Sequence, residues 1–183
     1  MKFIRGLLVS VLSSYVLVSV GGTMAADSGV SEGDRAFVAK AAQGGMMEVA
    51  AGKLATQRGL DTAVKDFGGR MVTDHTAANE KLKSLADSKQ LVLPDSLSED
   101  QSAALGKLQA LVGRDFDRAY SRMMVKDHTE DISDFEKEVK KGQDADVKSF
   151  AQDTLPTLHH HLTLASKLQS LRHLQPYQEL LDP

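Results

Sequence analysis

The sequence predicts an all-α domain. From residue 34 onward, apolar residues recur at spacings of three and four, which is the pattern of a buried face on an amphipathic helix. Alternating runs rich in Val, Ile and Thr, which are typical of strands, are absent from the sequence. Only four of the 183 residues are proline, so long helices meet few interruptions. This length suits a single domain.

The first 25 residues have the layout of a secretory signal peptide. Lys2 and Arg5 give a positive start, residues 6–20 are largely apolar, and small residues precede a cleavage point after Ala25, with Ala26 as an alternative. The apolar run is shorter than the roughly 20 residues that a membrane span needs. An uncleaved N-terminal anchor is the competing interpretation. We expect export, to the periplasm or to the periphery of the outer membrane, and no transmembrane segment in the mature chain.

Capping residues divide the rest of the chain into elements. Residues 26–33 form a polar lead-in, and residues 34–174 form the helical domain. The first long helix is expected over residues 34–58, because Gly59 follows as a stop. The second is expected over residues 61–88, with its first residue, an aspartate, as the N-cap.

The second half of the domain repeats this arrangement after a shorter helix. That shorter helix is predicted over residues 98–111, and the third long helix over residues 115–141. The fourth is predicted over residues 144–173, where Pro156 either kinks the helix or splits it in two. The tail, residues 175–183, has no clear period, so we expect it to be loosely ordered.

Short turns join the first long helix to the second and the third to the fourth, so the helices pair as two antiparallel hairpins. About 25 residues separate the hairpins, which is enough to cross the bundle from end to end. The expected fold is a ferritin-like, up-down-down-up four-helix bundle with a short extra helix in the connection between the second and third long helices. A simple up-down bundle is the alternative.

A six-residue motif occurs twice. Residues 71–76 and residues 124–129 agree at five of six positions, at an offset of 53. Each copy places a methionine four residues before a histidine, so the two side chains share one helix face. Duplicated ancestry, with the methionines as core filler, is the simplest interpretation.

Four inward-facing polar residues fall near the middle of the predicted bundle. They come one from each long helix and lie within one to two helical turns of a common level: Glu48, His75, His128 and His161. One carboxylate and three imidazoles suit Zn, Cu, Ni or Fe(II). Met71 and Met124, one turn away, would favour copper as auxiliary ligands. A metal-free cluster, in which the carboxylate accepts hydrogen bonds from the histidines, satisfies the same groups.

The histidine run at residues 159–161 needs a choice, because consecutive residues point about 100° apart on a helix. His161 is favoured as the inward residue, and His159 is the competing one. A di-iron carboxylate centre is not expected. Such a centre uses Glu-x-x-His pairs on two helices, and no glutamate stands three residues before any histidine in this sequence.

Composition narrows the function further. The chain has no cysteine, which excludes disulfides, thiolate metal sites and cysteine nucleophiles. A net charge of −3 has the wrong sign for a nucleic-acid partner. Nucleophile elbows, phosphate-binding loops and dinucleotide fingerprints are absent from the sequence. We therefore assign no catalytic and no cofactor-binding residue and favour a non-enzymatic protein.

Several motifs, in this order, resemble a known family. They lie at residues 41–49, 52–55, 64–68, 70–75, 113–120, 124–128 and 155–165. Together they are similar to the exported bacterial family called domain of unknown function 4142, over roughly residues 33–170. The resemblance implies a ferritin-like fold and export, and the family is often labelled a predicted outer membrane protein. It implies no reaction. The four inward polar residues match motif positions of the family.

The expected function is that of an exported, soluble helical bundle that binds one divalent or copper ion at mid-bundle, for sequestration or in an envelope stress role. Two other functions stay open: a metal-dependent oxidoreductase that uses the same site, and a metal-free structural or interaction module. The expected partners are a second copy of the chain or another component of the envelope.

Overall fold

The structure is a computed structural model whose described residues are 29–178, with side chains described as far as residue 170. The predicted signal peptide, residues 26–28 of the polar lead-in and the last five residues lie outside the described residues. The described part consists of five helices without a strand: α1 (Glu32–Arg58), α2 (Thr62–Ser88), α3 (Glu99–Gln109), α4 (Gly113–Lys141) and α5 (Ala145–Gln178). The predicted all-α class is confirmed.

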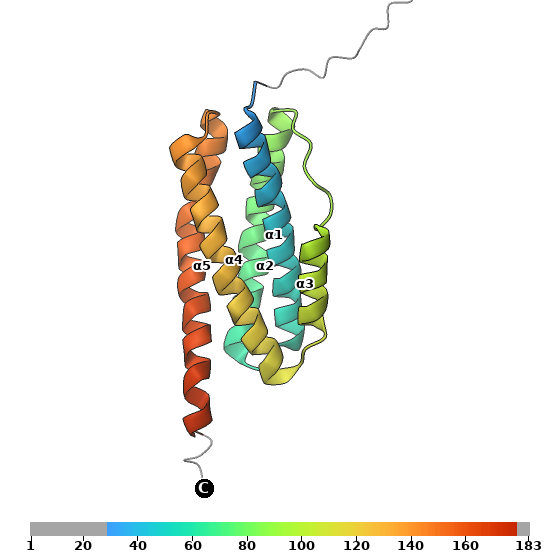
Figure 1. Ribbon diagram of the computed structural model, residues 1–183, viewed down its shortest axis with the longest axis vertical. Coiled ribbons are helices and arrows are strands. Elements are labelled where there is room, and N and C mark those ends of the chain that lie inside the picture. Colours follow the sequence, from blue (N-terminus) through green and yellow to red (C-terminus); the bar gives the residue numbers. More distant parts are fainter. Residues whose placement is uncertain (1–28, 179–183) are drawn as a thin grey trace, which may run out of the picture.

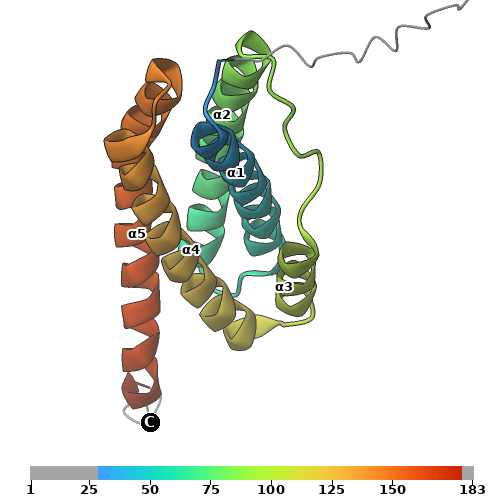
Figure 2. The ribbon, with the colours of Figure 1, turned by 45° about the horizontal axis from the view of Figure 1, so that its top comes forward.

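The four long helices form a bundle of two antiparallel hairpins (Figure 1). α1 pairs with α2 and α4 pairs with α5, while α1 also packs against α4 and α2 against α5. α1 and α5 run in one direction, and α2 and α4 run in the other. The connection between the hairpins runs along the outside of the bundle and carries α3, which packs against α1 and α4 (Figure 2). This is the predicted up-down-down-up arrangement.

Local capping explains where the helices start. Ser31 accepts a hydrogen bond from the backbone N–H of Asp34, so α1 begins two residues earlier than predicted. Asp61 caps α2 through the N–H of Ala63, as predicted. Ser98 and Gln101 form a capping box at the start of α3.

The last helix differs from its prediction. α5 is one helix through Pro156 and runs to Gln178, five residues beyond the predicted end. Pro156 is exposed, so its ring faces solvent and no neighbouring helix.

The apolar core is divided into two clusters along the bundle. One contains Phe67, Met71, Tyr120 and Met124 among its members, and the other contains Phe37, Leu82, Ile132, Phe135 and Leu158. On every long helix, a buried polar residue lies between the residues of one cluster and those of the other: Glu48, His75, His128 and His161. The bundle therefore has a polar layer across its middle, closed above and below by apolar side chains.

Two buried aspartates tie each hairpin to the turn of the other hairpin. Asp117 on α4 accepts hydrogen bonds from the backbone N–H groups of Leu60 and Asp61, at 2.9 and 3.0 Å. Asp34 on α1 accepts from the N–H groups of Gln143, at 3.0 Å, and Asp144, at 2.9 Å. Because both aspartates hold backbone atoms, they fix the hairpins at one relative height and thus align the polar layer.

Among the described residues, no helix combines the length and the apolar character that crossing a membrane requires.

Candidate metal centre

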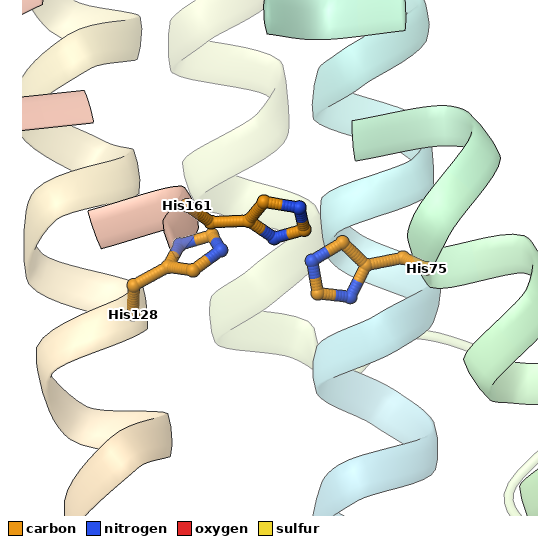
Figure 3. Close-up of side chains that lie close together, drawn as sticks. All are labelled: His75, His128 and His161. Carbon is orange, nitrogen blue, oxygen red and sulfur yellow. The ribbon is translucent and has the colours of Figure 1, made fainter. Parts of the chain in front are cut away.

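Three histidines from three helices meet in the polar layer (Figure 3). His75 lies on α2, His128 on α4 and His161 on α5, and all three are buried. One ring nitrogen from each histidine lies within 4.8 Å of the corresponding nitrogens of the other two. The ring centroids are 5.3 to 5.6 Å apart. The three imidazoles therefore surround one small volume.

One nitrogen of each ring is held by a neighbouring oxygen. Nδ1 of His75 is 2.8 Å from Oε2 of Glu48, and Nε2 of His161 is 2.9 Å from Oδ2 of Asp74. Nδ1 of His128 is 2.9 Å from the backbone carbonyl oxygen of Met124. A carbonyl oxygen can only accept, so this nitrogen of His128 carries the proton. Asp74 and Glu48, in their ionised forms, accept in the same way from Nε2 of His161 and from Nδ1 of His75.

The opposite nitrogen of each ring has no hydrogen-bond partner among the described residues. These atoms are Nε2 of His75, Nε2 of His128 and Nδ1 of His161, and all are buried. Since the protons sit on the other side of the rings, each of these atoms presents a lone pair. Leaving a buried polar atom unsatisfied costs about 1–3 kcal/mol. Three such atoms facing one volume are difficult to explain without a bound group.

Burial also keeps the three rings neutral. It lowers the pKa of His75, His128 and His161 to about 4, because a charged imidazolium loses its hydration in the core. Metals bind the neutral form of imidazole. The histidines are therefore ready to act as ligands at neutral pH without first releasing a proton.

Glu48 contacts two of the rings on their outer side. Its Oε2 holds His75, and its Oε1 lies 3.4 Å from Nδ1 of His128. Burial raises the pKa of this carboxyl to about 7, although the nearby His128 acts in the opposite direction. In this geometry Glu48 orients ligands, because it contacts the nitrogens that do not face the shared volume. Direct ligation by Glu48 stays a prediction.

Sequence reasoning missed further carboxylates beside the centre. Asp74 holds His161, and Asp131 lines a small pocket together with Glu48 and His75. Burial raises the pKa of Asp131 to about 8 and that of Asp127 to about 6. One signal was available: in both copies of the six-residue motif an aspartate directly precedes the histidine.

The remaining predicted residues fall into two groups. Met71 and Met124 are fully buried in the apolar cluster next to the polar layer, one helical turn from His75 and His128. The carbonyl of Met124 takes part by holding His128. In the histidine run, His161 faces the core while its two neighbours are exposed, which settles the choice between His159 and His161.

The dimensions fit a small metal ion. A tetrahedral ion with metal–nitrogen bonds of about 2.0–2.1 Å places its nitrogen ligands about 3.3 Å apart. Nitrogens within 4.8 Å of one another therefore need to close by no more than about 1.5 Å. On each ring, the nitrogen that faces away from the shared volume is held by an oxygen, as is usual for metal-binding histidines.

Comparison with known proteins agrees with the fold. The family model described as domain of unknown function (DUF4142) matches residues 21–168. A crystal structure of a DUF305 fragment from Deinococcus radiodurans superposes with a TM-score of 0.69 at 11% identity, covering 77% of this chain and 97% of that one. At this identity the similarity concerns the fold alone. No curated protein matches the chain.

Proposed function

Because the chain belongs to the DUF4142 family, whose function is unknown, we propose its function from its own residues: it binds one metal ion through His75, His128 and His161. One observation carries the proposal. Each of the three buried rings is held on one side by an oxygen, and each directs an unpartnered lone pair into the same volume.

The donor set narrows the kind of metal. Three neutral imidazoles suit Zn, Cu, Ni and Fe(II), whereas Ca and Mg prefer oxygen ligands. Glu48 and Asp74 strengthen the binding by accepting the outer protons of two rings, which raises the basicity of the inner nitrogens. The role we favour is sequestration, because all four helices and both apolar clusters enclose the centre.

The first experiment measures metal retention. The untagged protein, residues 26–183, is exposed to Cu, Zn, Fe, Mn and Ni in turn, freed of unbound ion and analysed for its elements. We expect close to one equivalent of one metal. Retention of none of these metals would refute the proposal.

A pair of variants assigns the metal to the centre. His161→Ala removes one inward ligand and should abolish retention, whereas His159→Ala removes an exposed histidine from the same helix and should leave retention unchanged. Circular dichroism checks that both variants keep their helices. Equal retention by the two variants would place the metal elsewhere.

We also propose that this bundle acts outside the cytoplasm, in the periplasm or at the periphery of the outer membrane. The proposal is supported by the charged start, apolar run and small residues of the first 25 positions. Mass analysis of protein recovered from the periplasm of an expressing bacterium should give a chain that begins at Ala26 or Asp27. A full-length chain confined to the cytoplasm would contradict it.

A further inference from the structure

A cleft beside the metal centre opens between α1, α3 and α4. Its volume is about 440 Å³. Five of the residues that line it are acidic: Glu48, Asp100, Asp127, Glu130 and Asp131. Two lysines also line it, but Lys126 is paired with Glu130 at 2.9 Å and Lys40 with Asp134. Neither Asp127 nor Asp131 forms an ion pair within the described part of the chain, so the acidic groups that line the cleft outnumber its basic groups by five to two.

Glu48 connects this cleft to the histidines. It is the most buried of the lining residues, with 2% of its surface exposed. Its Oε2 binds His75, while its Oε1 has no hydrogen-bond partner in the described structure. A buried carboxylate oxygen without a donor is a site that a cation would satisfy.

A smaller pocket shares two of its lining residues with the cleft. Its volume is about 20 Å³, and its lining includes Glu48, Asp131 and His75. This is enough space for one water molecule or one ion. Glu48 and Asp131 line both the cleft and this pocket, so these two carboxyl groups connect the cleft with the surroundings of His75.

The cleft offers several oxygen donors close to the histidines. Glu48, Asp127 and Asp131 all line it, and carboxylate oxygens are ligands that divalent cations accept.

We propose that this cleft is the route by which the metal ion reaches the centre, with Glu48, Asp127 and Asp131 as an oxygen-donor loading site. The inference rests on the proposed function. A hydrated divalent cation enters between α1 and α4, exchanges part of its water for carboxylate oxygens and passes to the three imidazoles. Carboxylates hold late first-row metals less tightly than a set of imidazoles does, so transfer runs inward. Negative charge in a cleft of this kind raises cation association rates by 10- to 1,000-fold.

The test follows the rate of uptake of Zn²⁺ and Cu²⁺ by the metal-free protein in a stopped-flow instrument with a chromophoric indicator. Asp127→Asn and Asp131→Asn each remove one carboxyl group from the cleft without changing side-chain size, and each should slow uptake at least tenfold. Asp153→Asn removes a similar charge from an exposed position on α5 and should leave the rate unchanged.

A second variant blocks the cleft without touching its charges. Ala104 lines the cleft from α3, so Ala104→Trp should slow uptake at least tenfold and still reach one equivalent. Thermal unfolding checks that each variant is folded.

The outcomes separate the two claims. The loading route is overturned, and the metal centre is left intact, if the wild-type protein fills to one equivalent and all three cleft variants fill within twofold of its rate. These variants are Asp127→Asn, Asp131→Asn and Ala104→Trp. Wild-type protein that takes up neither ion would overturn both. Slow uptake by the three cleft variants, with normal uptake by Asp153→Asn, supports the route.

Discussion

Glu138 should make this protein less stable as the pH rises, and a single substitution should remove the effect. Glu138 lies on α4 with 6% of its surface exposed, beside the carboxyl of Asp34. Backbone N–H groups of Gln143 and Asp144 favour the ionised form of Asp34, whose pKa is lowered overall even though its burial acts the other way. Burial and the neighbouring Asp34 raise the pKa of Glu138 from an ordinary 4.5 to about 7, with Asp144 acting in the same direction and Lys148 against it.

The direction of this pH dependence follows from the number of protons that the folded and the unfolded states bind. Between about pH 4.5 and pH 7, Glu138 keeps its proton in the folded protein and loses it in the unfolded chain. The free energy of unfolding therefore falls as the pH rises through this range. A pKa increase from 4.5 to about 7 corresponds to about 3 kcal/mol, present below pH 4.5 and lost above pH 7.

Glu138→Gln imitates the protonated state, because its side-chain amide can donate to Asp34 at every pH. The variant should match the wild type at pH 4 and exceed it by about 3 kcal/mol at pH 8, or roughly 6–12 °C in Tm for a domain of this size. Urea unfolding of the metal-free protein in the presence of a chelator, followed by circular dichroism, measures both values. Glu80→Gln, at an exposed position on α2, should show no such difference. A Glu138→Gln protein that is less stable than the wild type at pH 8 would refute the reasoning.

Three further predictions follow from the same structure. Glu48→Gln weakens the contact that holds Nδ1 of His75 and should lower metal affinity 10- to 100-fold in a chelator competition assay. Unchanged affinity would contradict the role of Glu48 in orienting the ring. Asp117→Ala leaves two backbone N–H groups of the first turn without acceptors and should cost about 2–4 kcal/mol in urea unfolding, whereas a loss under 1 kcal/mol would count against the contact. Gly68→Ala places a Cβ 2.7 Å from the Cβ of a residue on α1 and should destabilise the fold by about 1–3 kcal/mol. At Gly69 the nearest atom would be 4.0 Å from the new Cβ, so Gly69→Ala should stabilise the fold by about 0.5–1 kcal/mol. Thermal unfolding of the two variants measures the difference.

The sequence predicted the helices and the level of the polar layer because both depend on local periodicity. Glu48, His75 and His128 each lie on the apolar stripe of their own helix, where a polar side chain stands out. The choice of His161 over His159 depended on the rotation of α5, which a run of three histidines specifies poorly. It became definite only when the packing of α2 against α5 was known.

The missed residues make contacts between helices. Asp74 lies about 100° around α2 from His75 and reaches His161 on α5, so no pattern within α2 alone reveals its role. Asp34 and Asp117 stand near the starts of α1 and α4, where an acidic residue is ordinary. Their function depends on turns that are far away in the sequence.

The repeated motif is misleading about the architecture. Its offset of 53 relates α2 to α4, which run in the same direction and are not a hairpin pair. The two buried aspartates and the turns that they hold are related instead by an offset of 83, which matches α1 with α4. That correspondence is visible in residue identity as well, because residues 34–36 and residues 117–119 both read Asp-Arg-Ala, and each turn has a glycine two residues before an aspartate.

The contacts of Asp117 and Asp34 with the turns differ in sequence separation, and this difference affects the order of folding. Asp117 closes a loop of 57 residues onto Leu60, whereas Asp34 closes a loop of 109 residues onto Gln143. Longer closures cost more chain entropy, so the contact of Asp117 forms at the smaller entropic cost. It also needs no residue beyond α4. During synthesis, the first hairpin can therefore capture α4 before α5 has emerged, and His161 is the last of the three histidines to arrive.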